Sequence, residues 1–352
     1  MTEHSSSPGG TRFLTGAASL VVIIWGINQA QSALASSLVA VFLAILGTPL
    51  VRWLERKRFP SVTAVLLVLG GMLAVLLSAA GLVGSSLGGF SEALPSYQLR
   101  MEERASALTA LLAKKGVHIT DKAVLEYLNP AAVMKLFVGT LGGLGSVVSN
   151  LVLIMLTVLF ILLEASSFPV KLRAVLGEPR LRFPEFTQFV DDIQRYMLVA
   201  TGLNLAAGVL IGIWLAVLGV DSPVLWGFLA FLLLYIPHIG SILAAVPAVS
   251  LTLVQFGIGR AALVAAGYVA IAFTIGNVIW PKLMGRKLSL STLVVFLSLI
   301  FWGRMLGLLG AVLCVPFTMT LKFLFENHER TRWLAVLLGP GIPAKKGGGP
   351  ES

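Results

Sequence analysis

Long apolar runs alternate with short polar segments along the chain, and the length of each run predicts the structure that it forms. A helix that crosses a bilayer needs about 20 consecutive apolar residues. Six runs approach that length and predict six full membrane spans, at about residues 13–27, 33–50, 62–82, 146–163, 198–220 and 261–280. The first run could also pass for a signal peptide, but a second apolar run follows it at once, which favours a first span. This pattern is typical of an all-α polytopic membrane protein.

Two further apolar blocks, residues 224–256 and 288–325, are too long for one span, while half of either block is short for one. The first block carries Pro237 and Gly240 at its middle, and the second carries Gly303 and Arg304. A bilayer tolerates an interrupted helix only where the freed backbone is buried in protein or faces a water-filled cavity. The blocks therefore predict two re-entrant helical hairpins, and the alternative is a chain with eight plain transmembrane helices.

The positions of Lys and Arg favour the hairpins. Short cytoplasmic loops of membrane proteins carry an excess of these residues. If residues 224–256 crossed the bilayer once, Lys282, Arg286 and Lys287 would lie outside, whereas a hairpin returns all three to the cytoplasm. The second block then enters from the cytoplasm, so the two hairpins enter from opposite faces, as inverted repeats do. This arrangement places both termini in the cytoplasm.

Polar composition divides the chain into five segments. Charges of both signs interrupt the apolar pattern after residue 84, and leucines at helical spacing among them predict amphipathic helices outside the membrane. The segments are three spans in 1–87, a small extramembrane helical insert in 88–145, the fourth span and a cytoplasmic amphipathic helix in 146–197, the core with both hairpins in 198–325, and a cytoplasmic tail in 326–352.

Composition excludes several classes of function. The chain is 57% hydrophobic and 12% charged, which a soluble domain could not bury. The formal net charge is +10, but the Lys and Arg residues stand mainly at the ends of apolar runs, so we expect membrane lipid rather than nucleic acid as a partner. The four His residues are scattered, the single Cys314 lies in an apolar run, and no Gly-Lys-Ser phosphate loop is present. We therefore expect no enzyme, no cofactor and no metal site.

The middle of the first block carries the strongest candidate site. Pro237 lacks an amide hydrogen and frees backbone groups, and Gly240 permits the turn that follows. Ser241 and His238 are the polar side chains beside those groups. These residues predict a solute site made of backbone amides, a hydroxyl and an imidazole. The alternative is a hairpin tip whose polar atoms only satisfy each other.

Other polar residues in apolar runs are further candidates. Asn277 stands one turn before Pro281, so its amide could bond the backbone that the proline frees or contact a solute. Asn204, with glycines nearby, is more typical of helix packing. Arg304 either reaches the membrane interface or meets an anionic solute. Positions that we expect to serve as hinges or packing contacts are Gly285, Gly303, Gly307, Gly310 and Pro316.

Four motifs in the second half carry a family resemblance. Residues 235–241 contain an Ile-Pro-x-x-Gly element, residues 277–286 an Asn-Val-x-x-Pro-x-x-x-Gly element, residues 301–310 a glycine-rich element, and residues 315–318 a Val-Pro-x-Thr element. With these motifs the chain resembles the autoinducer-2 exporter family of bacterial carriers, and most closely its quorum-signal exporter branch. The first half matches that family only in its pattern of spans and its insert.

The resemblance implies a homo-oligomeric carrier in the inner membrane of a bacterial cell, with a pentamer as one candidate. Such carriers export small organic solutes, and some relatives are ion antiporters. This chain departs from the branch where Ala200 replaces a usual Lys, Leu234 a common Asn, Trp280 a frequent acid and Arg304 an aromatic residue. Cation coupling generally needs a carboxylate in the membrane, and the acids here stand only at span ends. We expect a secondary transporter that exports a small polar solute of the autoinducer-2 type by alternating access. Alternatives are an uncoupled channel or scaffold, a regulator acting through the insert, and an ion antiporter.

Overall fold

The computed structural model describes residues 29–114, 150–165, 183–284, 290–327, 329 and 331–339, together with scattered positions between 15 and 26. Every element formed by these residues is a helix, which confirms the all-α prediction. The predicted span at 13–27, most of the insert and the tail beyond 339 lie mainly outside the described residues.

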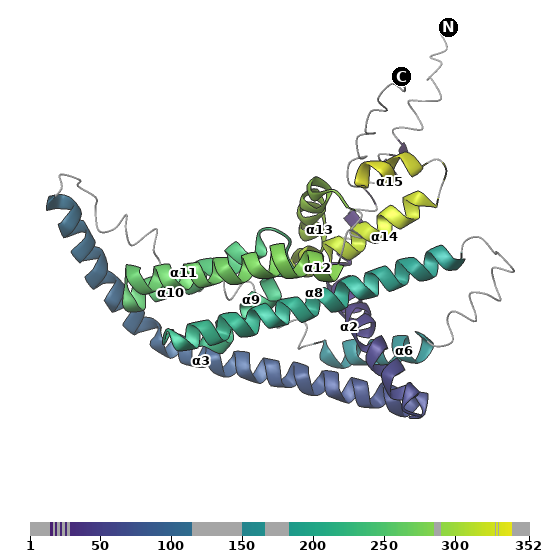
Figure 1. Ribbon diagram of the computed structural model, residues 1–352, viewed down its shortest axis with the longest axis horizontal. Helices are drawn as coiled ribbons and strands as arrows, with labels where there is room; N and C mark the ends of the chain where they lie inside the picture. Colours follow the sequence, from purple (N-terminus) through teal and green to yellow (C-terminus); the bar gives the residue numbers. More distant parts are fainter. Residues whose placement is uncertain are drawn as a thin grey trace, which may run out of the picture.

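Three helices form an N-terminal bundle: α2 (Gln31–Arg56), α3 (Ser61–Lys114) and α6 (Leu151–Ala165). Ala40 and Ala44 of α2 are buried against Val65 of α3 and Val158 of α6. Gly47 lets α2 approach its neighbours closely, since a Cβ there would lie 2.8 Å from the Met72 side chain. Helix α3 continues without a break past the predicted start of the insert (Figure 1). The described part of the insert therefore extends a membrane helix.

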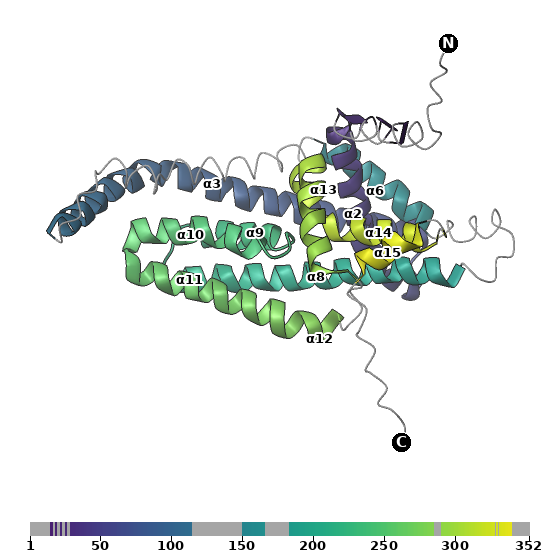
Figure 2. The same cartoon turned by 90° about the horizontal axis from the view of Figure 1, so that it is seen from above.

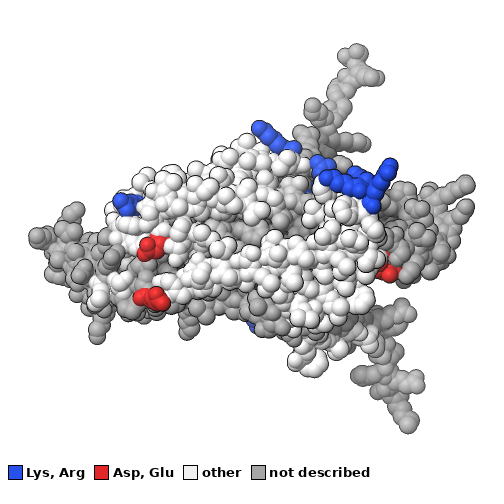
Figure 3. Space-filling view, turned by 90° about the horizontal axis from the view of Figure 1, so that it is seen from below, with Lys and Arg blue, Asp and Glu red and all other residues white. Residues whose placement is uncertain are grey.

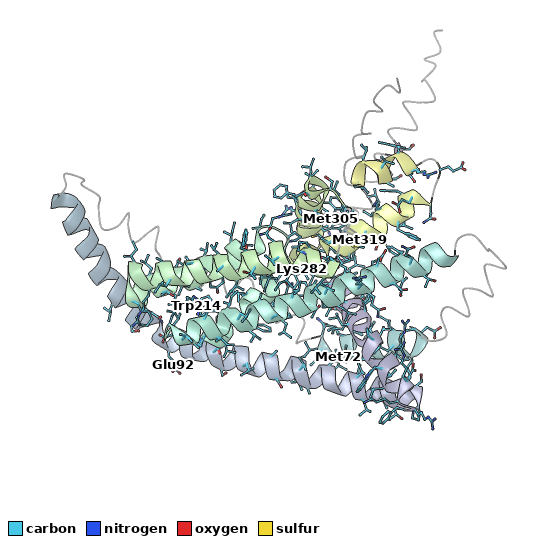
Figure 4. The ribbon with its side chains drawn as sticks, viewed as in Figure 1. Met72, Glu92, Trp214, Lys282, Met305 and Met319 are labelled. Atoms are coloured by element: carbon cyan, nitrogen blue, oxygen red, sulfur yellow. The ribbon has the colours of Figure 1, made fainter. Side chains whose placement is uncertain are left out.

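A second group of helices lies side by side along the long axis of the molecule (Figures 1 and 2). It comprises α8 (Phe183–Val217), α9 (Pro223–Leu233), α10 (Gly240–Phe256), α11 (Ile258–Phe273), the π-helix η1 (Thr274–Ile279) and α12 (Trp280–Met284). Helices α8 and α9 cross where Gly208 meets Gly227, because a Cβ on either glycine would lie 2.6 Å from the carbonyl oxygen of the other. Trp214 of α8 donates a hydrogen bond of 3.2 Å to the Leu263 carbonyl of α11 (Figure 4).

Helix α8 joins two predicted elements into one. The predicted amphipathic segment and the predicted span at 198–220 form a single helix of 35 residues. Phe189, near its start, stacks on Phe323 with ring centroids 4.2 Å apart, and Phe186 lies 6.2 Å from the same ring. The apolar face of the amphipathic segment thus packs partly on protein.

Pro281 widens the helical segment Ile258–Met284, in which it lies. Pro281 has no amide hydrogen for the carbonyl of Asn277, four residues earlier, and its ring would clash with that carbonyl in a regular α-helix. The preceding turn is accordingly a π-helix, Thr274–Ile279. The helix nevertheless continues to Met284.

The second apolar block forms α13 (Thr292–Val312) and α14 (Cys314–Glu326), followed by α15 (Arg332–Leu338). Both views show α13 running across the direction of α8, whereas α14 runs toward one end of the molecule (Figures 1 and 2). The amide of Ser291 donates a hydrogen bond of 3.1 Å to the Leu338 carbonyl. The chain before α13 and the end of α15 therefore meet.

Within the described residues, five helices are long and apolar enough to cross a membrane: Leu34–Arg56, Ser61–Ser86, Phe186–Val217, Ile258–Met284 and Thr292–Val312. Shorter apolar helices are Leu151–Ala165, Pro223–Leu233 and Gly240–Phe256. Figure 3 shows a broad middle region free of Lys, Arg, Asp and Glu on the face that it displays. Large apolar side chains are exposed on most of these helices. Such a surface fits a membrane protein with several spans.

Candidate functional site

The first apolar block folds back on itself, with a tight turn at residues 234–239 between α9 and α10. His238 has φ of 63° and takes the left-handed conformation in this turn, where His is one of the better tolerated residues. Gly240 does not have a positive φ, so the turn does not use its freedom in that way. Gly240 instead allows close packing, because a Cβ there would lie 2.0 Å from the Leu233 carbonyl oxygen. His238 itself is exposed, and Pro237 is half-buried.

The turn leaves hydrogen-bond donors open at the start of α10. The amides of Ile236, Ile239 and Gly240 donate to backbone carbonyls of the turn. In the described part of the chain, the amides of Ser241 and Ile242 donate to no backbone carbonyl, and no side chain caps the helix. The Ser241 side chain is half-buried, and its hydroxyl bonds no described residue. The positive end of the α10 dipole, two amides and a hydroxyl are thus available to a polar group.

A face of α8 lies against this turn. Residues 201, 204 and 208 follow at helical spacing and share that face. Gly208 contacts Phe231 of α9, since a Cβ on the glycine would lie 2.9 Å from the Phe231 Cβ. Tyr235 donates a hydrogen bond of 2.7 Å to the Thr201 hydroxyl. Asn204 lies between these two contacts, buried to 6% exposure, and its amide bonds no other described residue. Asn204 is therefore buried on the same face as the close helix contact of Gly208.

The two ends of this hairpin are joined. The Gln255 side chain at the end of α10 donates to the Asp221 carboxylate at 2.6 Å and accepts from the Asp221 amide at 3.4 Å. Trp226 of α9 donates to the Asp221 carbonyl at 3.0 Å. Ser222 and Gly257, beside the two ends, both have positive φ. The block 224–256 therefore begins and ends at the same end of the molecule.

The second block breaks later than expected. Gly303 and Arg304 lie in regular helix, and the non-helical residue is Gly307, with φ of 66° and ψ of −147°. Beyond it, Gly310 approaches the backbone closely, because a Cβ there would lie 2.0 Å from the Trp302 carbonyl oxygen. Only glycine fits such a contact without a backbone shift. The break in the second block therefore covers residues 307–313, called the second tip below, and Arg304 lies one turn before it.

Arg304 and Pro316 occupy very different surroundings. Arg304 is exposed on the face of α13 that also exposes Ile300 and Phe301. Pro316 is buried in the first turn of α14, where a missing amide hydrogen costs nothing. Gly303 has room for a side chain, since a Cβ there would meet only the Ala311 methyl group, at 3.7 Å.

The breaks in the two apolar blocks contribute residues to one buried cluster. Tyr235 and Ile236 of the first tip and Ala311 and Leu313 of the second are members of the same apolar core. Figures 1 and 2 both show the end of α9 and the junction of α13 with α14 near the middle of the molecule. Figure 4 places Met305 and Met319, which flank the second tip, in that region. The two helix breaks, about 70 residues apart in sequence, thus contribute side chains to the same apolar core.

Asn277 and Pro281 do not join this region. Both residues are exposed on the surface of the segment Ile258–Met284. Ile275, in the same π-helix as Asn277, packs on Leu203. Asn277 bonds no described residue, so the backbone-bonding role considered for its amide is not observed. Gly285 lies outside the described residues.

Sequence reasoning missed the partners of the first tip. Tyr235 was part of the Ile-Pro motif, and Thr201 stood alone in an apolar span, so neither carried a signal of its own. Of the four positions where the chain departs from the resembled branch, the three apolar ones, Ala200, Leu234 and Trp280, also lie close together. Leu234 and Trp280 share a small cluster with Leu203, and Trp280 packs on Tyr196, one turn before Ala200, with ring centroids 5.8 Å apart.

Breaks near the middle of apolar helical blocks recur in transport proteins, where such breaks form the solute site. The family model described as AI-2E family transporter matches residues 17–330, so the chain belongs to this family. It is 37% identical over 319 residues to the AI-2 transport protein TqsA of Escherichia coli, covering 91% of this chain and 93% of TqsA. It is 33% identical over 337 residues to YhhT of Escherichia coli, a protein provisionally named as a transport protein, covering 96% of this chain and 97% of YhhT.

Proposed function

We propose that this protein is a secondary transporter that exports a small polar organic solute of the autoinducer-2 type by alternating access. The observation that carries the proposal is the open start of α10, where the amides of Ser241 and Ile242 and the Ser241 hydroxyl have no described partner. Half-helix ends of this kind bind polar groups of the substrate in other transporters. The name of the relative TqsA supplies the solute class.

The solute site comprises the first tip and the α8 face against it. Ser241 and the amides at the start of α10 bind solute oxygens, and Asn204 can supply two donors and an acceptor beside them. His238 is exposed at the turn and can add one further polar contact. Tyr235, held by its hydrogen bond to Thr201, forms the wall of the site. Arg304 and Asn277, being exposed elsewhere, are assigned to surfaces that meet lipid headgroups or another subunit.

Both apolar blocks are re-entrant hairpins in this proposal, and they enter from opposite faces of the membrane. The joined ends at Asp221 and Gln255 support an external mouth for the first hairpin. The Lys and Arg residues around α12 and the α2–α3 turn support a cytoplasmic position for the other end. We further propose that the protein is a homo-oligomer in the inner membrane with both termini in the cytoplasm.

An uncoupled channel is the second candidate, and one observation favours it. Ala200, Leu234 and Trp280 replace polar residues of the resembled branch, and all three lie in apolar packing near the first tip. The described long membrane helices carry no acid near their middle, which also disfavours an ion antiporter. The apolar replacements remove groups that could couple transport to an ion. They do not remove the open donors at Ser241, which bind the solute in this proposal.

Counterflow in proteoliposomes separates these candidates. Purified protein is reconstituted with unlabelled autoinducer-2 inside the vesicles, and entry of labelled autoinducer-2 is followed. A carrier gives saturable uptake that internal solute accelerates, a channel gives flux that neither saturates nor accelerates, and a scaffold gives none. Either of the last two results contradicts the proposal.

Cysteine labelling tests the hairpin topology. Single cysteines replace Ser222 or Lys282 in a Cys314→Ala background, and intact cells are treated with a membrane-impermeant thiol reagent. We expect external labelling at position 222 and labelling at position 282 only after permeabilisation. Equal external labelling at both positions restores eight plain spans.

A further inference from the structure

Helix α2 contacts the tips of both hairpins. The Phe42 ring meets the Tyr235 ring edge-on, with centroids 5.9 Å apart and planes at 78°. At the start of α2, the Gln31 side chain lies beside the second tip, because a Cβ on Gly307 would be 3.1 Å from Nε2 of Gln31. Between these contacts and the end of the helix, Gln194 of α8 donates to the Ile45 carbonyl at 3.4 Å.

The opposite face of α2 fixes it to the N-terminal bundle. Ala40 and Ala44 are almost fully buried there, and the Met72 and Leu162 side chains press on Gly47. The face toward the hairpins carries larger side chains at helical spacing, Leu38, Phe42 and Ile45, which are only partly buried. Small residues pack α2 tightly on its own bundle, whereas bulky residues cover the tips. A movement of the bundle therefore carries α2 with it.

We infer that α2 is a gate over the side of the solute site that Tyr235 forms, and that Phe42 is the side chain that closes this side. This inference rests on the proposed transport function. In the observed state Tyr235 donates to Thr201, meets the rings of both Phe42 and Phe231 edge-on, and is 9% exposed. Movement of the N-terminal bundle away from the hairpins removes Phe42 from Tyr235 and opens the first tip toward the space that α2 occupied. The same movement separates Gln31 from Gly307, so both tips respond to one displacement.

The first test replaces Phe42 and measures access to the site. Phe42→Ala is made together with Ser241→Cys in a Cys314→Ala background, and the rate of modification by a small thiol reagent is measured in reconstituted vesicles. An edge-on aromatic contact shifts an equilibrium about threefold to tenfold, so we expect the rate to rise by about that factor. Phe42→Tyr keeps the ring and should keep the parental rate. Leu43→Ala is the matched control, since Leu43 packs on the N-terminal bundle instead.

A second test restrains α2. Cysteines at Ile45 and Gln194 are joined by a short bifunctional thiol reagent, which ties the N-terminal bundle to α8. We expect counterflow to stop on cross-linking, while each single-cysteine variant treated with the same reagent keeps parental counterflow. Full transport by the cross-linked protein overturns the gate.

The outcomes distinguish the gate from the transport function. If the parent protein exchanges solute but Phe42→Ala and Leu43→Ala give the same modification rate, the gate is wrong and the carrier stands. If the parent shows no counterflow, the proposed function fails, and the gate fails with it.

Discussion

Gly240→Ala is expected to disrupt the first tip, although alanine is the smallest possible change. The new Cβ would lie 2.0 Å from the carbonyl oxygen and 2.8 Å from the carbonyl carbon of Leu233. Carbon and oxygen normally approach no closer than about 3.3 Å, so the two backbone segments would have to separate by roughly 1 Å. Both partners are backbone, and no rotamer change can relieve the contact.

The expected cost lies at the upper end of that for overpacking, about 3 kcal/mol. In a protein of this size such a loss lowers the Tm by roughly 5 °C. The assay is thermal unfolding of the detergent-solubilised protein, followed by tryptophan fluorescence, with counterflow measured on the same preparation. We expect Gly240→Ala to unfold earlier and to lose transport.

Gly202→Ala is the matched control for this prediction. Gly202 lies on an exposed face of α8, and a Cβ there would meet no atom within 4 Å. Alanine favours a helix over glycine by about 0.5–1 kcal/mol, so this variant should be at least as stable as the parent. If Gly240→Ala has the parental Tm and transports normally, the close contact with Leu233 is not a feature of the folded protein.

Three further perturbations test other parts of the structure. Tyr268→Phe removes a buried hydroxyl that has no partner among the described residues, so the Tm should rise, by the equivalent of about 1 kcal/mol, and a lower Tm would contradict this. Gln255→Leu leaves the Asp221 carboxylate without its 2.6 Å donor, so amide hydrogen exchange around Asp221 should accelerate, and unchanged exchange would show that the hairpin ends do not depend on this contact. Replacing sodium by potassium should leave transport unchanged, because the described long membrane helices carry no acid near their middle, and a steep sodium requirement would refute the assignment of no cation coupling.

The break in the first block was predictable from Pro237 together with the nearby Gly240, whereas Pro49 and Pro247 lie inside helices that continue. Pro237 stops α9 through its missing amide hydrogen and its ring, and these effects need no tertiary contact. The π-helix before Pro281 has the same local cause. Apolar spacing also predicted the face of α8 around Phe186 and Phe189, although it did not indicate that Phe323 would cover this face.

The break in the second block was misplaced because glycine permits a left-handed conformation without requiring it. Gly303, Gly307 and Gly310 look equivalent in the sequence, and only the packing of α13 on α14 gives Gly307 a positive φ and brings Gly310 against Trp302. In the first tip the glycine was expected to provide the turn, but His238 has the left-handed conformation. Gly240 instead makes the close contact with the Leu233 backbone.

The outward positions of Asn277 and Arg304 could not be read from the sequence. A polar residue in an apolar helix indicates that it has a partner, but the direction in which it points depends on how the helix is rotated against its neighbours. Here Ile275 and Leu299 face the core, which turns Asn277 and Arg304 outward. Tyr235 and Thr201 could be recognised as partners only from their 2.7 Å contact.

Protection of position 241 from thiol modification tests whether the solute binds at the first hairpin tip. Ser241→Cys and Asn277→Cys are prepared separately in the Cys314→Ala background, and thiol modification is timed with and without saturating autoinducer-2. We expect the solute to slow modification at position 241 several-fold and to leave modification at position 277 unaffected. Protection of position 277 alone, or of neither position, would contradict a solute site at the first hairpin tip.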